Sequence, residues 1–463
     1  MKIHSKPTKQ LISALPYFPD SAALFSVVVD KPWAAFLDSG YPYSDQGRYD
    51  IIAAEPVTTL VTQGETTQIS LNGSVGFSNA DPFDLVKQAL AAYSFETIPG
   101  LPFNGGAIGY FSYDLARRLE KIPVISVDAE HIPEMAIGIY NWVVLVDHHK
   151  KQSFLVGWDC AEDHWQSLIG LFSKLPEKDH TSHFRVTNAV KSNMDKAGYT
   201  HAFERIKHYL KEGDCHQVNL SQRFVADCEG DPWTAYRLLR EMNAAPFSAY
   251  LNFPDVQILS SSPERFLKLE DGRVETKPIK GTRPRKAYPA SDWLQIDQLR
   301  YSPKDRAENL MIVDLLRNDL SKTCTIGSVK VPALFAVESY ATVHHLVSTV
   351  TGVLAAGKHA LDLLKSCFPG GSITGAPKIR AMEVIEELEH NRRGVYCGAI
   401  GYIGFDGNMD SNIAIRTLVH SKGTIRFWAG GGIVNDSVLE EEYQECFDKA
   451  SALLSLLDKL RTK

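Results

Sequence analysis

The sequence lacks the features that mark several common classes of protein. Its seven cysteines occur singly, with no Cys-x-x-Cys pair and no zinc-type spacing, so we expect reduced thiols in a cytoplasmic protein rather than a disulfide framework. No apolar run approaches the roughly 20 residues of a membrane span. The short apolar stretch at 22–29, between Asp20 and Asp30, has no signal-peptide layout. The net charge of −6 argues against binding to nucleic acid or to an anionic membrane.

With 463 residues, the chain is large for a single hydrophobic core. Residues 174–197 are polar and poorly periodic, which predicts a linker between an N-terminal region, 1–173, and a C-terminal region, 198–460. Strands dominate both regions, with long helices interspersed, and this pattern indicates the α+β class. The two regions either form independent domains or combine their strands in one sandwich.

One lysine lies close to a predicted hairpin. Residues 266–279, with a turn at Asp271-Gly272, are typical of a β-hairpin. The hairpin folds the chain back on itself, so Glu264 and Lys280 are expected to lie close together, as a carboxyl acid or base beside an amine nucleophile. An amine attacks only when deprotonated, so such a site must lower the pKa of the lysine by desolvation or by nearby cations. The alternative is a surface hairpin with a solvated lysine and glutamate.

A predicted helix at 302–320 carries two carboxylates near its start. Apolar residues occur nearly all round this helix, which predicts that it is buried. Asp305 and Glu308 lie one turn apart, where the helix dipole favours negative charge. Carboxylates are also the ligands that a hard divalent cation needs.

A second helix with acidic residues is predicted near the C-terminus. Ser437 and Glu440 form a predicted capping box at its start. Glu442, Glu445 and Lys449 then share one face. A solvated face with a Glu–Lys pair is one interpretation. The other is a Mg²⁺ site, because Mg²⁺ is held by few carboxylates together with substrate oxygens.

Two glycine-rich segments are candidate anion-binding elements. Residues 369–378 form a predicted loop that ends at a helix start, where backbone N–H groups suit a carboxylate or phosphate. The helix is predicted to turn Ile379, Met382, Ile385 and Leu388 inward. Residues 429–433 form a second predicted loop, where bare backbone can approach a ligand. Neither segment is a Walker loop or a dinucleotide fingerprint.

A lone arginine and a histidine pair add to these candidates. Arg416 lies on a strand predicted at 412–418 and needs an anion if it is buried. His344 and His345 occupy opposite faces of a predicted strand, which argues against one shared metal ion. One of them is expected to be structural, and the other can face a site.

Together these motifs resemble the chorismate-utilising enzymes, the family of anthranilate, isochorismate and salicylate synthases. Within that family the chain is most similar to the aminodeoxychorismate synthase component I group. The strings that carry the resemblance are CHQVNLSQRF (215–224), SPERF (262–266), PIKGTRPR (278–285), KDRAENLMIVDLLRND (304–319), HHLVS (344–348), PGGSITGAPK (369–378), GYIGF (401–405), IAIRT (413–417), AGGGIV (429–434) and EYQE (442–445). Two positions distinguish the groups. Anthranilate synthases carry a small residue in place of Lys280, and isochorismate and salicylate synthases carry a water-activating lysine in place of Gln217.

The resemblance implies a fold, a reaction and a set of roles. The fold would be two large packed β-sheets with helices outside. Lys280 would add to chorismate as its 4-hydroxyl leaves, with Glu264 as general acid, and ammonia would then displace Lys280 to give 4-amino-4-deoxychorismate. The residues implied to hold Mg²⁺ are Glu308 and Glu445, with Asp305 and Glu442 in support. Those implied to bind the substrate are His345, Thr374, Tyr402, Arg416, Gly430, Gly431, Gly432 and Lys449.

The same family also implies an amino-acid pocket between the two regions. Relatives hold tryptophan there, and the matching segments in this chain are Leu37-Asp38-Ser39 and Pro246-Phe247-Ser248. An aromatic-lined cleft with polar edges suits an indole ring. The alternative is ordinary core packing.

A separate glutamine amidotransferase is the expected partner, because no cysteine lies in a Gly-flanked nucleophile elbow. Three other interpretations stay open. They are an anthranilate synthase, a lysine enzyme that forms Schiff bases, and a non-catalytic sensor of chorismate or an amino acid.

Overall fold

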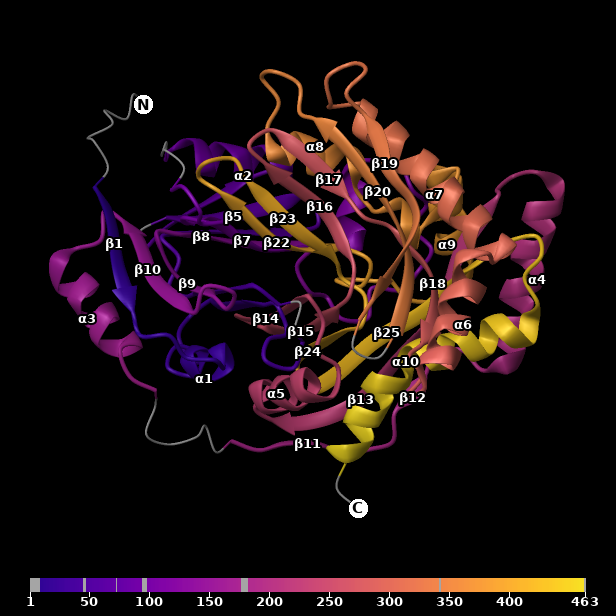
Figure 1. The fold of residues 1–463 in the computed structure, drawn as a ribbon, viewed down its shortest axis with the longest axis horizontal. Helices are drawn as coiled ribbons and strands as arrows, with labels where there is room; N and C mark the ends of the chain where they lie inside the picture. The colour runs from indigo at the N-terminus through magenta and orange to yellow at the C-terminus, as the bar shows by residue number, and fades with distance from the viewer. Residues whose placement is uncertain are drawn as a thin grey trace.

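The computed structural model describes residues 9–44, 47–71, 73–93, 98–175, 182–340 and 343–461. Within these ranges, two large sheets lie face to face and helices cover their outer surfaces (Figure 1). All the paired strands run antiparallel. The predicted α+β sandwich is therefore confirmed. In the same ranges, no helix is long and apolar enough to cross a membrane.

The first sheet has 13 strands among the described residues. In spatial order they are β1 (Gln10–Leu15), β10 (Gln152–Trp158), β9 (Trp142–Asp147), β3 (Tyr49–Ala53), β2 (Ala34–Asp38), β14 (Phe247–Phe253), β15 (Val256–Ser262), β24 (Thr417–Ser421), β25 (Thr424–Ile433), β13 (Gln217–Gly230) and β11 (Phe184–Val186), with β12 (Lys191–Ser192) and β21 (Gly375–Ala376) beside β13.

The second sheet has 12 strands in the described part of the chain. In spatial order they are β18 (Ile279–Pro284), β20 (Val343–Val353), β17 (Arg273–Thr276), β16 (Arg265–Glu270), β23 (Met409–Ile413), β22 (Ala399–Gly404), β7 (Gly106–Phe111), β8 (Met135–Tyr140), β4 (Thr58–Gln63), β5 (Thr66–Leu71) and β6 (Ser74–Ser78), with β19 (Lys330–Ser339) beside β20.

Helices pack on the outside of both sheets. They are α1 (Ser21–Phe25), α2 (Pro82–Ala91), α3 (Glu162–Phe172), α4 (Lys196–Glu212), α5 (Pro232–Met242), α6 (Pro289–Arg300), α7 (Pro303–Ser321), α8 (Ala360–Cys367), α9 (Lys378–Leu388) and α10 (Leu439–Lys459), with 3-10 turns at Tyr113–Arg118 and Gly371–Ile373.

The central strands are apolar on both faces because both faces are buried. In β9, Trp142 and Val144 belong to the core under the outer helices, whereas Val143 and Leu145 belong to the core between the sheets. Successive side chains on a strand point to opposite faces. A strand covered on both sides therefore has a continuous apolar run instead of an alternating one.

The two regions of the chain share both sheets. Early strands β2 and β3 lie beside late strands β14 and β15, and β7 lies beside β22 (Figure 1). The segment 174–197, predicted as a linker, contains β11, β12 and the start of α4, and its residues 176–181 lie outside the described ranges. The regions on either side of it are thus combined in one sandwich, which was one of the two arrangements left open by the sequence.

The predicted hairpin forms, with a turn in which both Asp271 and Gly272 have positive φ. Its second arm breaks after Thr276, and Lys280 lies on the next strand, β18, which pairs with β20 instead of β16. Lys280 therefore reaches its place through a second strand pairing and not through the hairpin alone.

Several local predictions were wrong. Residues 429–433 are the end of strand β25, not a loop, because β13 pairs with them. Arg416 lies between β23 and β24 with φ of 50°, not inside one strand. Helix α7 is buried on one side only, and Leu310 is 46% exposed on the other.

Two helix predictions also differ from the structure. Helix α10 has Val438 as its N-cap residue, without a capping side chain, because the Ser437 hydroxyl donates instead to Glu442 Oε1 at 2.6 Å. On α9, Met382, Ile385 and Leu388 are buried as predicted, but Ile379 is exposed.

Candidate functional site

A cavity of about 890 Å³ collects side chains from segments that are far apart in the sequence. It lies along β18, at the C-terminal ends of β15 and β25, and beside helices α7 and α10. The predicted site residues that line it are Glu264, Lys280, Asp305, Glu308, His345, Arg416, Gly430, Gly432, Glu442, Glu445 and Lys449.

Lys280 and Glu264 are joined through one residue, Ser372. The Lys280 ammonium donates to the Ser372 carbonyl oxygen at 3.3 Å, and the Ser372 hydroxyl donates to Glu264 Oε1 at 3.0 Å. The Asn219 amide also donates to the Ser372 carbonyl, at 3.3 Å. Ser372 thus connects the candidate nucleophile and the candidate acid within the cavity.

Burial favours the uncharged forms of both reactive groups. It lowers the pKa of Lys280, against the attraction of Glu308, and it raises the pKa of Glu264, against the attraction of Lys280 and the Ser372 hydrogen bond. An uncharged amine is the nucleophilic form of lysine, and a protonated carboxyl is the form that donates a proton. The cavity therefore favours the protonation states that an amine attack assisted by an acid requires.

A bulge at Gly281 shapes this part of β18. The pairing register with β20 shifts between Lys280 and Thr282, and Gly281 has φ of 75°. A Cβ at Gly281 would lie 2.8 Å from the Asp305 carboxyl carbon. Glycine is therefore required both for the backbone conformation and for the close approach of Asp305.

His345 and Arg416 form another wall. Burial and the nearby Arg416 lower the pKa of His345 to about 4, so its ring is neutral at neutral pH. The Nδ1 atom of this ring lies 2.9 Å from Thr282 Oγ1. Arg416 is largely buried, and among the described residues its guanidinium has no hydrogen bond or ion pair. A desolvated guanidinium in that state is suited to a carboxylate ligand. His344, on the opposite face of β20, bonds to Asp292 at 2.9 Å and Ser339 at 2.7 Å outside the cavity.

Three glutamates converge opposite Lys280. Glu308 comes from α7, and Glu442 and Glu445 come from α10. A Cβ at Gly431 would lie 3.2 Å from Glu442 Oε2 and 3.4 Å from Glu445 Oε1. Burial raises the pKa of Glu308, and the negative charges of Glu442 and Glu445 raise it further. The positive charge of Lys280 acts in the opposite direction and lowers it.

Lysines partly neutralise this acidic cluster. Lys304 lies 3.4 Å from Glu442, and Lys449 lies 2.6 Å from Glu445 and donates to the Gly430 carbonyl at 3.0 Å. In the described part of the chain, no group of three or more histidine, cysteine or acidic side chains is arranged as a complete metal site. Mg²⁺ usually takes only one or two carboxylates and completes its shell with water and substrate oxygens. The chemistry of the cluster therefore fits Mg²⁺.

Three predicted residues differ from the rest in their surroundings. Asp305 is held by Arg283 at 3.1 Å, so its carboxylate is already paired. Thr374 is fully buried and donates to the Gly370 carbonyl at 3.0 Å within its own loop. Tyr402 lines a different cavity.

Sequence reasoning missed several residues that line the site. Ser372, Asn219, Lys304, Tyr396 and Trp428 all line the cavity. Ser372, Asn219 and Lys304 lie inside three of the family strings, and this was the available signal. For Tyr396 and Trp428 no local pattern distinguishes a cavity wall from ordinary core.

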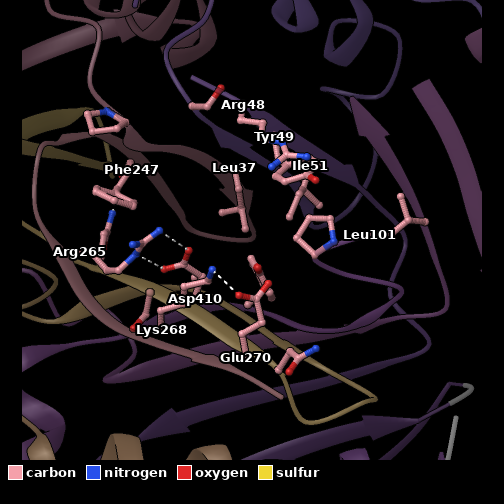
Figure 2. Close-up of a pocket in the computed structure, with 18 of the residues that line it drawn as sticks. Leu37, Arg48, Tyr49, Ile51, Leu101, Phe247, Arg265, Lys268, Glu270 and Asp410 are labelled. Atoms are coloured by element: carbon pink, nitrogen blue, oxygen red, sulfur yellow. Dashed lines mark hydrogen bonds and ion pairs between the residues drawn. The ribbon is translucent and has the colours of Figure 1, made fainter. Parts of the chain in front are cut away.

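A second cavity of about 850 Å³ lies between the two sheets and contains both predicted tryptophan-pocket segments, 37–39 and 246–248 (Figure 2). Arg265 is bound to Asp410 through two contacts of 3.0 and 3.1 Å and lies 4.9 Å from the centre of the Phe247 ring. Ser39 donates its hydroxyl to Asp50 at 2.6 Å. The cavity therefore has an aromatic wall and charged edges.

Comparison with known proteins identifies the family. The chorismate binding enzyme family matches residues 39–455. Aminodeoxychorismate synthase component 1 from Klebsiella aerogenes is 49% identical over 96% of this chain and 98% of its own length. Anthranilate synthase component 1 from Pseudomonas aeruginosa is 37% identical over 94% of this chain and 92% of its own length. The crystal structure of anthranilate synthase component I from Streptococcus pneumoniae superposes with a TM-score of 0.79 and 32% identity, covering 88% of this chain and 92% of that one.

This chain belongs to the chorismate binding enzyme family. The match spans strands of both sheets and every residue of the Lys280 cavity.

Proposed function

We propose that this chain aminates chorismate to 4-amino-4-deoxychorismate, a precursor of 4-aminobenzoate and folate, as the chorismate-binding component of a two-subunit enzyme. The observation that carries the proposal is the buried Lys280–Ser372–Glu264 arrangement, in which burial favours a neutral amine beside a protonated carboxyl. The relatives named aminodeoxychorismate synthase component 1 support it.

In the first step, the Lys280 amine forms a bond to C2 of chorismate. Both ring double bonds shift, from C1–C2 to C1–C6 and from C5–C6 to C4–C5, the bond from C4 to its hydroxyl breaks, and Glu264 gives its proton to that oxygen, which leaves as water. The Ser372 hydroxyl holds the Glu264 carboxyl in place for this transfer. General acid assistance of this kind typically contributes about 10²–10⁴-fold to a rate.

In the second step, ammonia bonds to C4, both ring double bonds shift back, and the bond from C2 to Lys280 breaks. The proton that ammonia loses returns to Glu264, so the enzyme regains its starting state. The balance is chorismate plus ammonia giving 4-amino-4-deoxychorismate plus water. The enolpyruvyl group stays on the ring, which makes the reaction a transfer of an amino group and not a lyase reaction.

Positive groups around the cavity would hold the substrate carboxylates. Arg416 is a desolvated cation without a protein partner in the described residues, and Lys449 also lines the cavity. Glu308 and Glu445, with Glu442 beside them, would hold Mg²⁺. When bound, that ion would neutralise the ring carboxylate and draw electron density toward it. Thr374 and Tyr402 have no direct part in this proposal.

A separate glutamine amidotransferase would supply the ammonia. Ammonia in neutral water is mostly ammonium, which is not nucleophilic. A glutaminase cysteine needs a lowered pKa, and burial raises the pKa of all seven thiols here, to about 12 for Cys228, Cys367 and Cys397. The thiols of this chain are therefore poor candidates for releasing ammonia from glutamine.

The test is incubation of the purified chain with chorismate, Mg²⁺ and an ammonium salt, followed by mass analysis. We expect 4-amino-4-deoxychorismate, and no product with glutamine alone. Anthranilate and pyruvate would instead identify an anthranilate synthase. A carbonyl adduct trapped on Lys280 by hydride would indicate Schiff-base chemistry, and the absence of any product would favour a sensor.

A further inference from the structure

Two amide side chains on strand β13 lie one behind the other at the wall of the Lys280 cavity. Gln217 is fully buried, and Asn219, two residues later, lines the cavity. Residues two apart on a strand point to the same face of the sheet. Here the Gln217 Nε2 donates a hydrogen bond to Asn219 Oδ1 at 3.2 Å. The interior of the sheet is thus connected to the cavity through this pair of amides.

The bond from Gln217 fixes which way the Asn219 amide faces. A side-chain amide accepts through its oxygen and donates through its NH₂ group. With Oδ1 bound to Gln217, the Asn219 Nδ2 donates to the Ser372 carbonyl oxygen at 3.3 Å. The backbone of Asn219 is held too, since its N–H donates to the Thr374 carbonyl at 2.8 Å and its carbonyl accepts from Arg393 at 3.2 Å. The NH₂ group therefore reaches Ser372 from a fixed position.

The neighbouring strand β25 leaves room for this amide pair. Gly432 is the cross-strand partner of Asn219, and Figure 1 shows the two strands side by side. A Cβ at Gly432 would overlap Gln217 Nε2 and would lie 2.9 Å from Asn219 Oδ1. Glycine at this position thus provides the space that the two amides occupy.

Packing alone does not require an amide at position 217. Within the described part of the chain, the Gln217 Oε1 accepts no hydrogen bond. A buried amide oxygen without a partner destabilises a fold, whereas an apolar side chain of similar shape avoids that cost. The interaction that such an apolar side chain could not supply is the hydrogen bond to Asn219.

Ser372 relates the amide pair to both reactive groups. Its carbonyl accepts from the Lys280 amine at 3.3 Å, and its hydroxyl donates to Glu264 at 3.0 Å. A neutral amine has a single lone pair, and an N–H that points at a carbonyl turns this lone pair away from that carbonyl. The direction of the Ser372 carbonyl therefore decides where the Lys280 lone pair faces, and a shift of Ser372 would displace the Glu264 carboxyl as well.

We infer that Gln217 and Asn219 are positioning residues for the Lys280 nucleophile. They hold the Ser372 carbonyl in the direction that leaves the lone pair of the bound amine facing the space for chorismate. Gln217 acts through Asn219 and touches neither the substrate nor the amine. The inference rests on the proposed function, because it concerns the amine that attacks in that reaction.

The test uses the full chain with Gln217→Met, which keeps the length of the side chain and removes its polar atoms. The variant is incubated with chorismate and Mg²⁺ without ammonia, and the rate at which Lys280 gains the substrate adduct is followed by mass. We expect this rate to fall about ten- to hundredfold, as for a slightly misplaced reacting group. The KM for chorismate with ammonium should stay within about twofold, and the Tm should stay close to that of wild type.

A double-mutant cycle separates this role from a general effect on packing. Asn219→Ala should slow adduct formation at least as much as Gln217→Met. The variant with both changes should be no slower than Asn219→Ala alone, because Gln217 has no other route to Ser372. Independent contributions would instead multiply in the double variant.

The matched control is Gln222→Met on the same strand. Gln222 is also fully buried and accepts a hydrogen bond from the Ser192 hydroxyl at 3.1 Å, but it is not among the residues that line the cavity. This variant should form the Lys280 adduct at the wild-type rate.

Several outcomes would overturn the inference. A wild-type rate of adduct formation in Gln217→Met would remove the positioning role and leave the proposed function standing. A slower rate that comes with a large fall in Tm, or effects that multiply in the double variant, would assign Gln217 to packing instead. A wild-type chain that makes 4-amino-4-deoxychorismate without any adduct would reject the nucleophile and this inference with it, and a wild-type chain without any product would reject the proposed function itself.

Discussion

At the scale of single residues, Lys280 has an environment unlike that of the other lysines near it. Its side chain is half-buried in the cavity wall and bonded to a backbone carbonyl, and desolvation lowers its pKa. Lys277, only three residues earlier, is paired at 2.5 Å with Glu338 outside the cavity. Lys280 is therefore the reactive candidate, and Lys277, in the break between β17 and β18, is an internal control.

We predict that Lys280→Ala lowers product formation by about 10³-fold or more, because the variant lacks the nucleophile. Lys277→Ala should stay close to wild type. Initial rates with chorismate and ammonium measure both, and circular dichroism checks that each folds. Wild-type enzyme kept without ammonia should gain the mass of dehydrated chorismate on Lys280. Near-normal turnover by the alanine variant would remove the nucleophile role.

Ser372 offers a test of Glu264 through pH dependence. The Ser372 hydrogen bond opposes the raised pKa of Glu264, so Ser372→Ala should raise that pKa further. A general acid loses activity as pH rises through its pKa, so the alkaline limb of the rate profile should move to higher pH. The rate should fall by roughly tenfold through loss of the hydrogen bond that positions the Glu264 carboxyl. Ser372→Thr should restore both. A profile that keeps its shape in the alanine variant would argue for a purely structural serine.

At the scale of elements, α7 and α10 matter because both helices face the same cavity. Each helix alone carries an ordinary run of charged residues, and Glu308 meets Glu442 and Glu445 only when both helices pack over β18 and β25. The clustered like charges raise the pKa of Glu308. A cation bound among them would relieve that repulsion.

We predict that Mg²⁺ is needed for activity and raises Tm, because it binds the folded carboxylate cluster. Glu308→Gln and Glu445→Gln should each abolish most activity and the Tm increase, since each removes one anionic ligand of similar shape. Glu440→Gln, an exposed position on the same helix that does not line the cavity, is the control. Full activity in a chelator would contradict the prediction, as would an unchanged Mg²⁺ response in both variants.

At the scale of the whole molecule, the interleaved sheets create a second cavity that neither region forms alone. Its walls include β2 from the early chain and β14 and β22 from the later chain. We predict that tryptophan binds there with a heat signal in calorimetry, whereas alanine does not. Phe247→Ala should weaken binding about three- to tenfold, through loss of aromatic contact. The absence of any tryptophan signal with the wild-type chain would reject this role.

The sequence by itself determined the local elements and the motif residues. The Asp271-Gly272 turn, the capped helix α4 that ends at Gly213 and the buried stripe of α10 all follow from neighbouring residues. Family strings also indicated Lys280, Glu264 and the glutamates in advance. These features depend on periodicity, turn chemistry and capping, which operate over a few residues.

Only the tertiary structure decided which of these groups meet. The glycines at 430–432 lie on a strand because β13, two hundred residues earlier in the chain, pairs with them. Arg416 lies outside the strand that the sequence predicted for it, because the chain passes from one sheet to the other between β23 and β24. Tyr402 lines the other cavity, and Ser372 joins Lys280 to Glu264, through long-range strand order. Sheet register couples distant segments by backbone hydrogen bonds that local composition does not encode. Many candidate residues could therefore be listed from the sequence, but their assembly into one cavity could not be predicted.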